Sequence, residues 1–345
     1  MSDVFRSDEV LELESGQRLY GFEIAYSTQG QLNAAKDNVV WVCHALTASA
    51  DVTDWWPGLF GENCLFNGHE HYIVCANVLG SCYGSTGPLS INLETGQKFY
   101  HEFPLITVRD MVQLHLRLAT HLGIETIHVL TGGSLGGQQA LEWSVIEPGR
   151  IKNLVVIATN ARHSAWGIAF NEAQRMAIKA DQTWKSNTDS AGNQGLKAAR
   201  AMALLSYRNY RTFSKTQAET DNNKTDDFKA SSYQQYQGLK LVKRFNAFSY
   251  TTLSKTMDSH NLGRGRGELT AVLAGIKAST LVVGFSSDIL FPVSEQEFLA
   301  RHIPRAEFAV IDSLYGHDGF LIETPTLTRI ISRFLVSNRE RLVSS

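Results

Sequence analysis

Residues Ile127–Trp143 have the sequence IHVLTGGSLGGQQALEW, which is the most informative segment of the chain. Its apolar start predicts a buried strand, its glycine-flanked serine predicts a sharp turn, and the remainder predicts a helix. This order is typical of a G-x-S-x-G nucleophile elbow, in which Ser134 holds a strained backbone conformation. Side chains at Gly132 and Gly136 would collide in such a turn, so both positions need glycine. The motif predicts a hydroxyl that stands above a helix N-terminus, where backbone N–H groups favour negative charge.

The composition is that of a globular protein with a large core. Of the 345 residues, 43% are hydrophobic and 19% are charged, and the formal net charge of −2 gives no reason to expect a nucleic-acid partner. The polar N-terminus does not resemble a signal peptide, and no apolar run approaches the roughly 18 residues of a membrane span. The cysteines lack C-x-x-C spacing, which favours buried thiols in a reducing compartment over a disulfide frame or a zinc site. We therefore expect a cytoplasmic protein.

Strands and helices alternate along most of the chain. An antiparallel hairpin is expected near residues 10–26, and a helix at each of 107–122 and 320–336. Besides the elbow strand, nearly continuous apolar runs predict buried strands at 38–46, 71–79, 153–158, 280–285 and 307–311. This alternation predicts an α/β protein with a mostly parallel central sheet flanked by helices.

The alternation stops between residues 163 and 267. This stretch is rich in Ala, Gln, Lys, Arg and Tyr, has helical apolar spacing, and lacks buried strand runs. We expect residues 163–267 to form a helical lid over the carboxyl ends of the strands. Residues 1–162 and 268–345 would then form the α/β core.

A serine hydroxyl needs a base before it can act as a nucleophile. In chains with this elbow the acid and the histidine follow the serine, each after a late strand. Asp288 follows the strand at 280–285, and His317 follows the strand at 307–311. We expect His317 to act as general base and later general acid, with Asp288 orienting its ring. Asp312 is the alternative acid, but its place at the end of the last strand favours a turn role.

Acyl chemistry also requires N–H donors for the oxyanion that develops. One donor is expected to be the backbone N–H of Leu135, directly after the serine. The other is expected from the loop that follows the strand at 38–46, and the N–H of Leu46 is the candidate.

Several segments, taken together, resemble the homoserine O-acetyltransferase family. They are residues 43–47, 77–88, 132–143, 170–175, 255–261 and 315–321. The resemblance implies an α/β-hydrolase fold with a helical lid and a homodimer joined through the lids. It also implies acetyl transfer from acetyl-CoA to the hydroxyl of L-homoserine, early in methionine biosynthesis, through a ping-pong acyl-enzyme. Acetyl-CoA is a co-substrate in this chemistry, and neither a metal nor a bound cofactor is expected.

The resemblance also implies substrate-binding residues. Asp318 would take the ammonium of homoserine, Arg175 its carboxylate, and Thr47 would lie at the substrate. The phosphates of CoA would need basic residues near the mouth of the site. The candidates are Lys240, Lys243 and Arg244, or Arg264 and Arg266.

Other functions fit parts of this pattern. The same chemistry could use L-serine as acceptor or succinyl-CoA as donor, because one methylene in a pocket is worth only about 1–3 kcal/mol. A simple carboxylesterase would need neither Asp318 nor Arg175. A non-catalytic binding protein on the same fold would have no use for a complete set of Ser134, Asp288 and His317.

Overall fold

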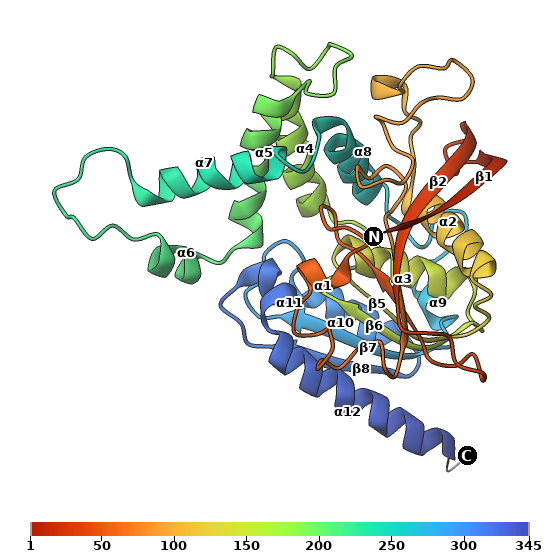
Figure 1. The fold of residues 1–345 in the computed structure, drawn as a ribbon. Coiled ribbons are helices and arrows are strands. Elements are labelled where there is room, and N and C mark those ends of the chain that lie inside the picture. The colour runs from red at the N-terminus through yellow and green to blue at the C-terminus, as the bar shows by residue number, and fades with distance from the viewer. Residues whose placement is uncertain (1, 344–345) are drawn as a thin grey trace.

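The computed structural model describes residues 2–343 and contains one sheet in that part of the chain. Its eight strands have the order β1-β2-β4-β3-β5-β6-β7-β8 (Figure 1). They are β1 (Asp3–Glu12), β2 (Arg18–Gln29), β3 (Val39–Cys43), β4 (Tyr72–Ala76), β5 (Ile127–Gly133), β6 (Ile151–Ile157), β7 (Ser279–Phe285) and β8 (Ala306–Ile311). β2 pairs antiparallel with β1 and with β4, and the other pairs are parallel. The expected hairpin and mostly parallel sheet are confirmed.

The sheet is buried on both faces because its central strands direct apolar side chains toward both of them. In β3, Val39, Trp41 and Cys43 contribute to one hydrophobic layer, whereas Val40 and Val42 contribute to the other. One face is covered by α2 (Val108–His121), α3 (Leu135–Ile146), α9 (Leu269–Ala274) and α10 (Val293–His302). The other is covered by α1 (Val52–Trp55), α11 (Gly319–Ile322) and α12 (Thr324–Val343). The result is a helix–sheet–helix sandwich with the catalytic candidates at one edge.

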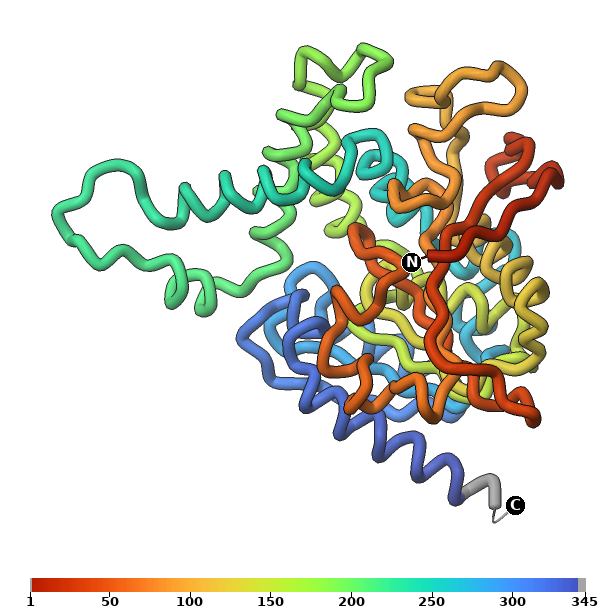
Figure 2. The backbone as a smooth tube through the Cα atoms, in the orientation of Figure 1, coloured from red at the N-terminus to blue at the C-terminus, as the bar shows by residue number. Residues whose placement is uncertain are grey.

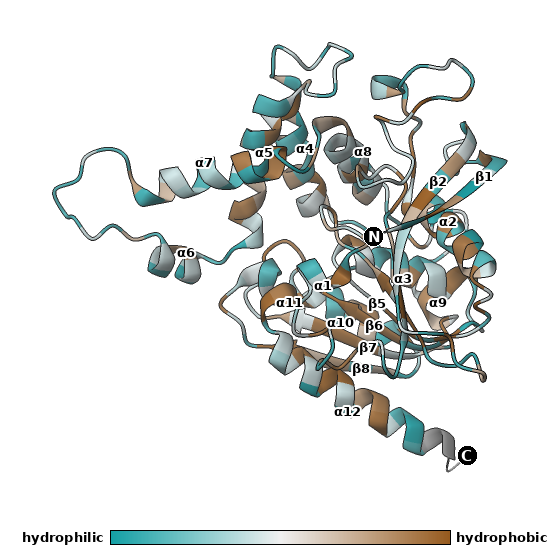
Figure 3. Ribbon diagram, in the orientation of Figure 1, coloured by the Kyte–Doolittle hydropathy of each residue, from teal (hydrophilic) through white to brown (hydrophobic). Residues whose placement is uncertain are grey.

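The stretch between β6 and β7 is helical, as its composition predicts. It contains α4 (Ala165–Lys179), α5 (Asn193–Tyr207), α6 (Tyr210–Thr216), α7 (Lys229–Val242) and α8 (Ala247–Asp258). The helices α6 and α7 and the loop between them form an arm that projects from the rest of the molecule (Figures 1 and 2). The loop of this arm is hydrophilic, whereas the central strands are hydrophobic (Figure 3). The division into lid and core at residues 163 and 267 stays a prediction.

Some elements differ from their predicted bounds for local reasons. The strand expected at 38–46 ends at Cys43, because His44 turns its ring toward the chain after β4 and accepts a hydrogen bond from the backbone N–H of Val78 at 3.0 Å. The helix expected at 320–336 is split into α11 and α12, and Glu323 lies between them. Pro325 lacks a backbone N–H and lies in the first turn of α12, where the N–H groups have no partner within the helix. Short 3-10 turns occur at Tyr100–Glu102 and Gly316–Asp318.

Within residues 2–343, no helix is both long enough and apolar enough to cross a membrane.

Candidate active site

Ser134 lies at the turn between β5 and α3 with φ 58° and ψ −124°. Such a conformation costs a non-glycine residue on the order of 1–3 kcal/mol, so the surrounding structure must hold it in place. The Ser134 N–H donates to the carbonyl of Ile157 at 3.0 Å, and its carbonyl accepts from the Thr159 hydroxyl at 2.8 Å. The strained conformation expected from the motif is therefore present and is fixed by the neighbouring strand.

The glycines of the motif are required by close backbone contacts. A Cβ on Gly136 would lie 2.0 Å from the carbonyl oxygen of Cys43, at the end of β3. A Cβ on Gly132 would lie 2.4 Å from the backbone of Gly136. Both distances are far below any tolerable contact, so α3 approaches the sheet this closely only because these side chains are absent.

His317 and Asp288 form a buried pair. The Nδ1 of His317 lies 2.7 Å from Oδ2 of Asp288, and neither side chain is more than 4% exposed. The other carboxylate oxygen, Oδ1, accepts from the N–H groups of Leu290 and Phe291 at 2.8 and 2.9 Å. These contacts fix the imidazole with Nδ1 as the donor and leave Nε2 available.

The alternative acid, Asp312, has a different partner. It accepts a hydrogen bond from the Ser286 hydroxyl at 2.7 Å and lies exposed at the end of β8. The structure therefore pairs His317 with the acid that follows β7, in the order along the chain that the motif predicts.

Ser134 and His317 open into the same cavity, which has a volume of about 520 Å³. Its lining residues come both from the α/β layers and from the helical segment between β6 and β7. The polar and charged side chains on its wall are Thr47, Ser49, Asp54, Tyr83, Ser134, Arg200, Tyr207, Lys240, Arg244, His317 and Asp318. In the described part of the chain no hydrogen bond joins the Ser134 hydroxyl to His317, so this hydroxyl remains free to meet a ligand. Such contacts commonly tighten only when substrate is bound.

Proteins of similar sequence identify the family to which this chain belongs. A family model for the alpha/beta hydrolase fold matches residues 38–324. A homoserine O-acetyltransferase of Cyclobacterium marinum is 50% identical over 336 residues, which cover 97% of this chain and 95% of that protein. The chain belongs to the homoserine O-acetyltransferase family.

Solved structures share the fold of this family member. A homoserine O-acetyltransferase from Bacillus anthracis superposes with a TM-score of 0.87 at 22% identity, covering 97% of this chain and 98% of that one. Esterase E22 superposes with a TM-score of 0.87 at 21% identity, covering 97% and 99%. Likenesses at this identity show the fold alone, so transfer and hydrolysis must be distinguished by side chains of the cavity.

The loop expected to supply an oxyanion donor is held by a neutral histidine. His44 is fully buried, its Nδ1 lies 2.8 Å from the carbonyl of Ala45, and its Nε2 accepts from the N–H of Val78. Burial lowers the pKa of His44 to about 4, which keeps the ring neutral near pH 7. The next residues of this loop place Leu46 at the cavity. In residues 2–343, the N–H groups of Leu46 and Leu135 donate to no other protein group.

Arg175 lies elsewhere than the resemblance implied. Its guanidinium is buried between α4 and α8, with Asp258 at 2.5 Å and Glu172 at 2.7 Å, and it donates to the Ser254 hydroxyl at 3.2 Å. It is not part of the cavity wall. The structure therefore does not bring Arg175 together with Ser134 and His317 at the cavity, and two carboxylates already neutralise its charge.

Arg200 occupies the position that sequence reasoning gave to Arg175. It extends from α5 into the cavity wall, and its guanidinium carbon lies 5.5 Å from the ring centre of Tyr207. Within residues 2–343 it forms no ion pair. The sequence does hint at this role, because Arg200 is the one charged residue in the run AARAMA and precedes Tyr207 by seven residues. That spacing places both side chains on the same face of a helix.

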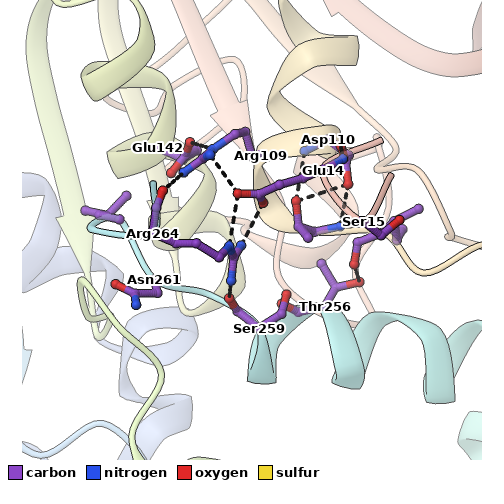
Figure 4. Close-up of polar contacts among 12 residues, drawn as sticks. Glu14, Ser15, Arg109, Asp110, Glu142, Thr256, Ser259, Asn261 and Arg264 are labelled. Carbon is purple, nitrogen blue, oxygen red and sulfur yellow. Dashed lines mark hydrogen bonds and ion pairs between the residues drawn. The ribbon is translucent and has the colours of Figure 1, made fainter. Parts of the chain in front are cut away.

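The basic residues considered for CoA fall into two groups. Lys240 and Arg244 line the cavity, and Lys243 is exposed beside them without being part of its wall. Arg264 and Arg266 lie in a separate ionic cluster, where they contact Glu14 at 2.7 Å and Glu142 at 2.5 Å (Figure 4 shows the contacts of Arg264). Only Lys240 and Arg244 are therefore placed to meet a ligand in the cavity.

Asp318 lies in the cavity wall next to His317. Burial raises the pKa of Asp318, and the nearby cations Arg208, His317 and Arg200 lower it in turn. The nearest is Arg208, whose Nε lies 2.8 Å from Oδ2 of Asp318. A largely buried carboxylate thus lines the same cavity as Ser134.

We predict that Gly136→Ala destabilises the protein and disturbs the elbow, because the new methyl group would overlap the Cys43 carbonyl. Overpacking of this kind costs roughly 1–3 kcal/mol of unfolding free energy. Urea unfolding measures it, with Gly149→Ala as the matched control, since a Cβ there meets nothing within 4 Å. Equal stability of the two variants would contradict the prediction.

Proposed function

We propose that the protein transfers an acetyl group from acetyl-CoA to the hydroxyl of L-homoserine. The observation that carries the proposal is that one cavity is lined by Ser134 and His317 and also by the carboxylate of Asp318 and the guanidinium of Arg200. The first pair suits acyl transfer, and the second pair suits the ammonium and carboxylate of an amino acid. The relatives named homoserine O-acetyltransferase, such as that of Cyclobacterium marinum, support the same activity.

In the first half-reaction Ser134 Oγ attacks the carbonyl carbon of the thioester while His317 Nε2 takes the hydroxyl proton. The N–H groups of Leu46 and Leu135 stabilise the oxyanion, and Asp288 stabilises the imidazolium. The C–S bond then breaks, and His317 returns the proton to sulfur. CoA leaves, and the acetyl group remains on Ser134.

In the second half-reaction the acceptor occupies the place that CoA has left. Asp318 binds its ammonium and Arg200 its carboxylate, and Thr47 lies at the same wall. His317 removes the proton of the acceptor hydroxyl, whose oxygen attacks the acetyl carbonyl carbon. The bond between that carbon and Ser134 Oγ then breaks, and His317 returns the proton to Oγ, which restores the free serine. Hydrogen bonds to charged groups contribute roughly 1.5–3 kcal/mol each, which favours the positioned acceptor over water.

Lys240 and Arg244 are the proposed contacts of CoA at this cavity. Arg244 already donates to the Tyr83 hydroxyl at 2.6 Å and to the backbone carbonyl of Thr47 at 2.5 Å. Its charge thus lies at the boundary between lid and core, where a phosphate can approach. No metal or bound cofactor takes part in the proposed steps.

L-serine as acceptor, a succinyl donor and plain ester hydrolysis remain the competing activities. The proposed activity belongs to methionine biosynthesis in the cytoplasm. The four cysteines are free thiols, which suits a reducing compartment.

We also propose a homodimer joined through the lid. An apolar groove of about 550 Å³ lies where the arm meets the core, and its wall includes Leu205, Tyr210, Phe213 and Ile289. Tyr210 is 83% exposed and Leu205 is 59% exposed. Large apolar side chains gathered in one exposed patch are unusual in a monomeric protein. A second copy of the arm would cover these side chains.

Ser134→Ala is expected to remove acetyl transfer while the protein stays folded. Without the hydroxyl no acyl-enzyme forms, and turnover falls by a factor on the order of 10⁴ or more. The assay follows free CoA released from acetyl-CoA or succinyl-CoA with homoserine, with serine, or with no acceptor. Ser144→Ala is the control, because that hydroxyl donates to the carbonyl of Ala140 within α3. Equal CoA release with and without acceptor would favour an esterase instead.

Arg200→Gln is expected to change the homoserine KM, whereas Arg175→Gln is expected to change the stability of the protein. The first removes the proposed carboxylate contact and raises the homoserine KM by about tenfold or more, with little change in stability. The second leaves Asp258 and Glu172 without their shared cation and lowers the unfolding free energy by roughly 3 kcal/mol. Steady-state kinetics and urea unfolding of both variants test this. If only Arg175→Gln raised the homoserine KM, Arg175 rather than Arg200 would be the residue that binds the homoserine carboxylate.

Tyr210→Glu is expected to dissociate the dimer, because it places a charge in the groove that the partner would cover. Sedimentation velocity measures the change. Gln235→Glu adds a charge to an exposed site on α7 and should leave the dimer intact. A wild-type protein that sediments as a monomer would refute the proposed dimer.

A further inference from the structure

The end of α5 rests directly on the loop that carries His317 and Asp318. Gly316 has φ 64°, and a Cβ there would lie 2.9 Å from the carbonyl oxygen of Tyr207 and 3.0 Å from the backbone of Arg208. The Thr212 hydroxyl donates to the carbonyl of Leu314 in the same loop. The lid therefore touches the catalytic loop through backbone atoms, and Arg208 is the residue at this contact.

The side chain of Arg208 meets Asp318 from outside the cavity. Arg208 lines the groove beside the arm, whereas Asp318 lines the cavity that holds Ser134. The Nε of Arg208 lies 2.8 Å from Oδ2 of Asp318 but forms no aligned hydrogen bond, so the contact is one of charge. In the described part of the chain Oδ1 of Asp318 accepts no hydrogen bond. One carboxylate oxygen is thus held from the lid side, and the other is available.

We propose that Arg208 is a positioning residue for the acceptor: it holds Oδ2 of Asp318 so that the carboxylate stays charged and presents Oδ1 to the ammonium of the amino acid. The inference rests on the proposed acetyl transfer and deepens it. Arg208 touches neither substrate nor reacting atoms, and it acts only through Asp318.

The charges around Asp318 explain why a dedicated cation is needed. Arg208, His317 and Arg200 favour its ionised form, whereas burial and the nearby Asp288 oppose it, and the buried Tyr207 also lies close by. His317 gains and loses its proton during each half-reaction, so its charge is not constant. Arg200 would be engaged by the carboxylate of the acceptor. Arg208 alone keeps a fixed positive charge next to Asp318 throughout the cycle.

The test compares Arg208→Gln and Arg208→Lys with Arg211→Gln as control. Arg211 is an exposed arginine three residues further along, whose side chain takes no part in the contacts of the site. Two readouts are needed at a series of pH values: the homoserine KM and kcat, and the burst of CoA released from acetyl-CoA without acceptor. The burst reports acylation of Ser134, which does not involve Asp318.

For Arg208→Gln we expect a homoserine KM about tenfold above that of the wild type, with an unchanged burst. Loss of the cation raises the pKa of Asp318, so its charged form is lost at a higher pH than in the wild type. The ratio of the variant KM to the wild-type KM should therefore grow as the pH falls. Arg208→Lys retains the charge and should lie between the two, while Arg211→Gln should match the wild type.

Other outcomes would overturn the inference. An unchanged KM at every pH would mean that Arg208 only packs against the loop. A lowered KM would mean that Arg208 competes with the ammonium for Asp318. If Arg208→Gln showed no burst, Arg208→Lys would decide. A full burst in that variant with a homoserine KM near the wild-type value would support the role of the charge, whereas loss of its burst as well would mean that Arg208 only supports the fold of the catalytic loop. Failure of wild-type acetyl transfer to homoserine would instead refute the proposed function itself.

Discussion

The contact on which the site depends is the approach of α3 to the end of β3. Gly136 meets the carbonyl of Cys43 at a distance that admits no side chain. This single approach sets Ser134 at the edge of the sheet and places the loop from His44 to Thr47 directly beside it. The nucleophile and the candidate oxyanion donors thus share one backbone constraint, and the strained angle at Ser134 is offset by hydrogen bonds to the next strand.

In the proposed mechanism, the residues that carry out the chemistry and those that bind the acceptor come from different parts of the chain. The core supplies Ser134, Asp288 and His317, whereas the lid supplies Arg200 and Arg208. Asp318 joins the two parts, because it follows His317 in the chain and pairs with a lid residue. Esterases share this fold, so a transferase can be distinguished only by charged groups that hold a second substrate in place of water.

A second set of charges has a structural role. Glu14 of the N-terminal hairpin contacts Arg109 at 2.6 Å and Arg264 at 2.7 Å, and Glu142 contacts Arg109 at 2.9 Å and Arg266 at 2.5 Å. These side chains tie the hairpin, α2, α3 and the segment after α8 together (Figure 4). Carboxylates as buried as Glu142 are costly unless paired, which explains why the glycine-rich segment near residue 265 carries arginines that never reach the cavity.

Patterns along the chain were sufficient to predict the elbow, the order of serine, acid and histidine, the parallel sheet and the helical character of residues 163–267. Each is set locally, by the steric demands of a turn or by the spacing of apolar side chains along one element. In contrast, the chain had to fold before Arg200 rather than Arg175 could face the cavity. Helical spacing tells which residues share a face, but the direction of that face depends on contacts between distant helices. Here Gly195 lets α5 approach the backbone of Ile178 on α4, and Gly238 lets α7 approach Lys197 on α5. With the helices packed in this way, Arg200 lines the cavity that holds Ser134, and Arg175 lies between Glu172 and Asp258. The spacing of residues within one helix cannot predict this orientation.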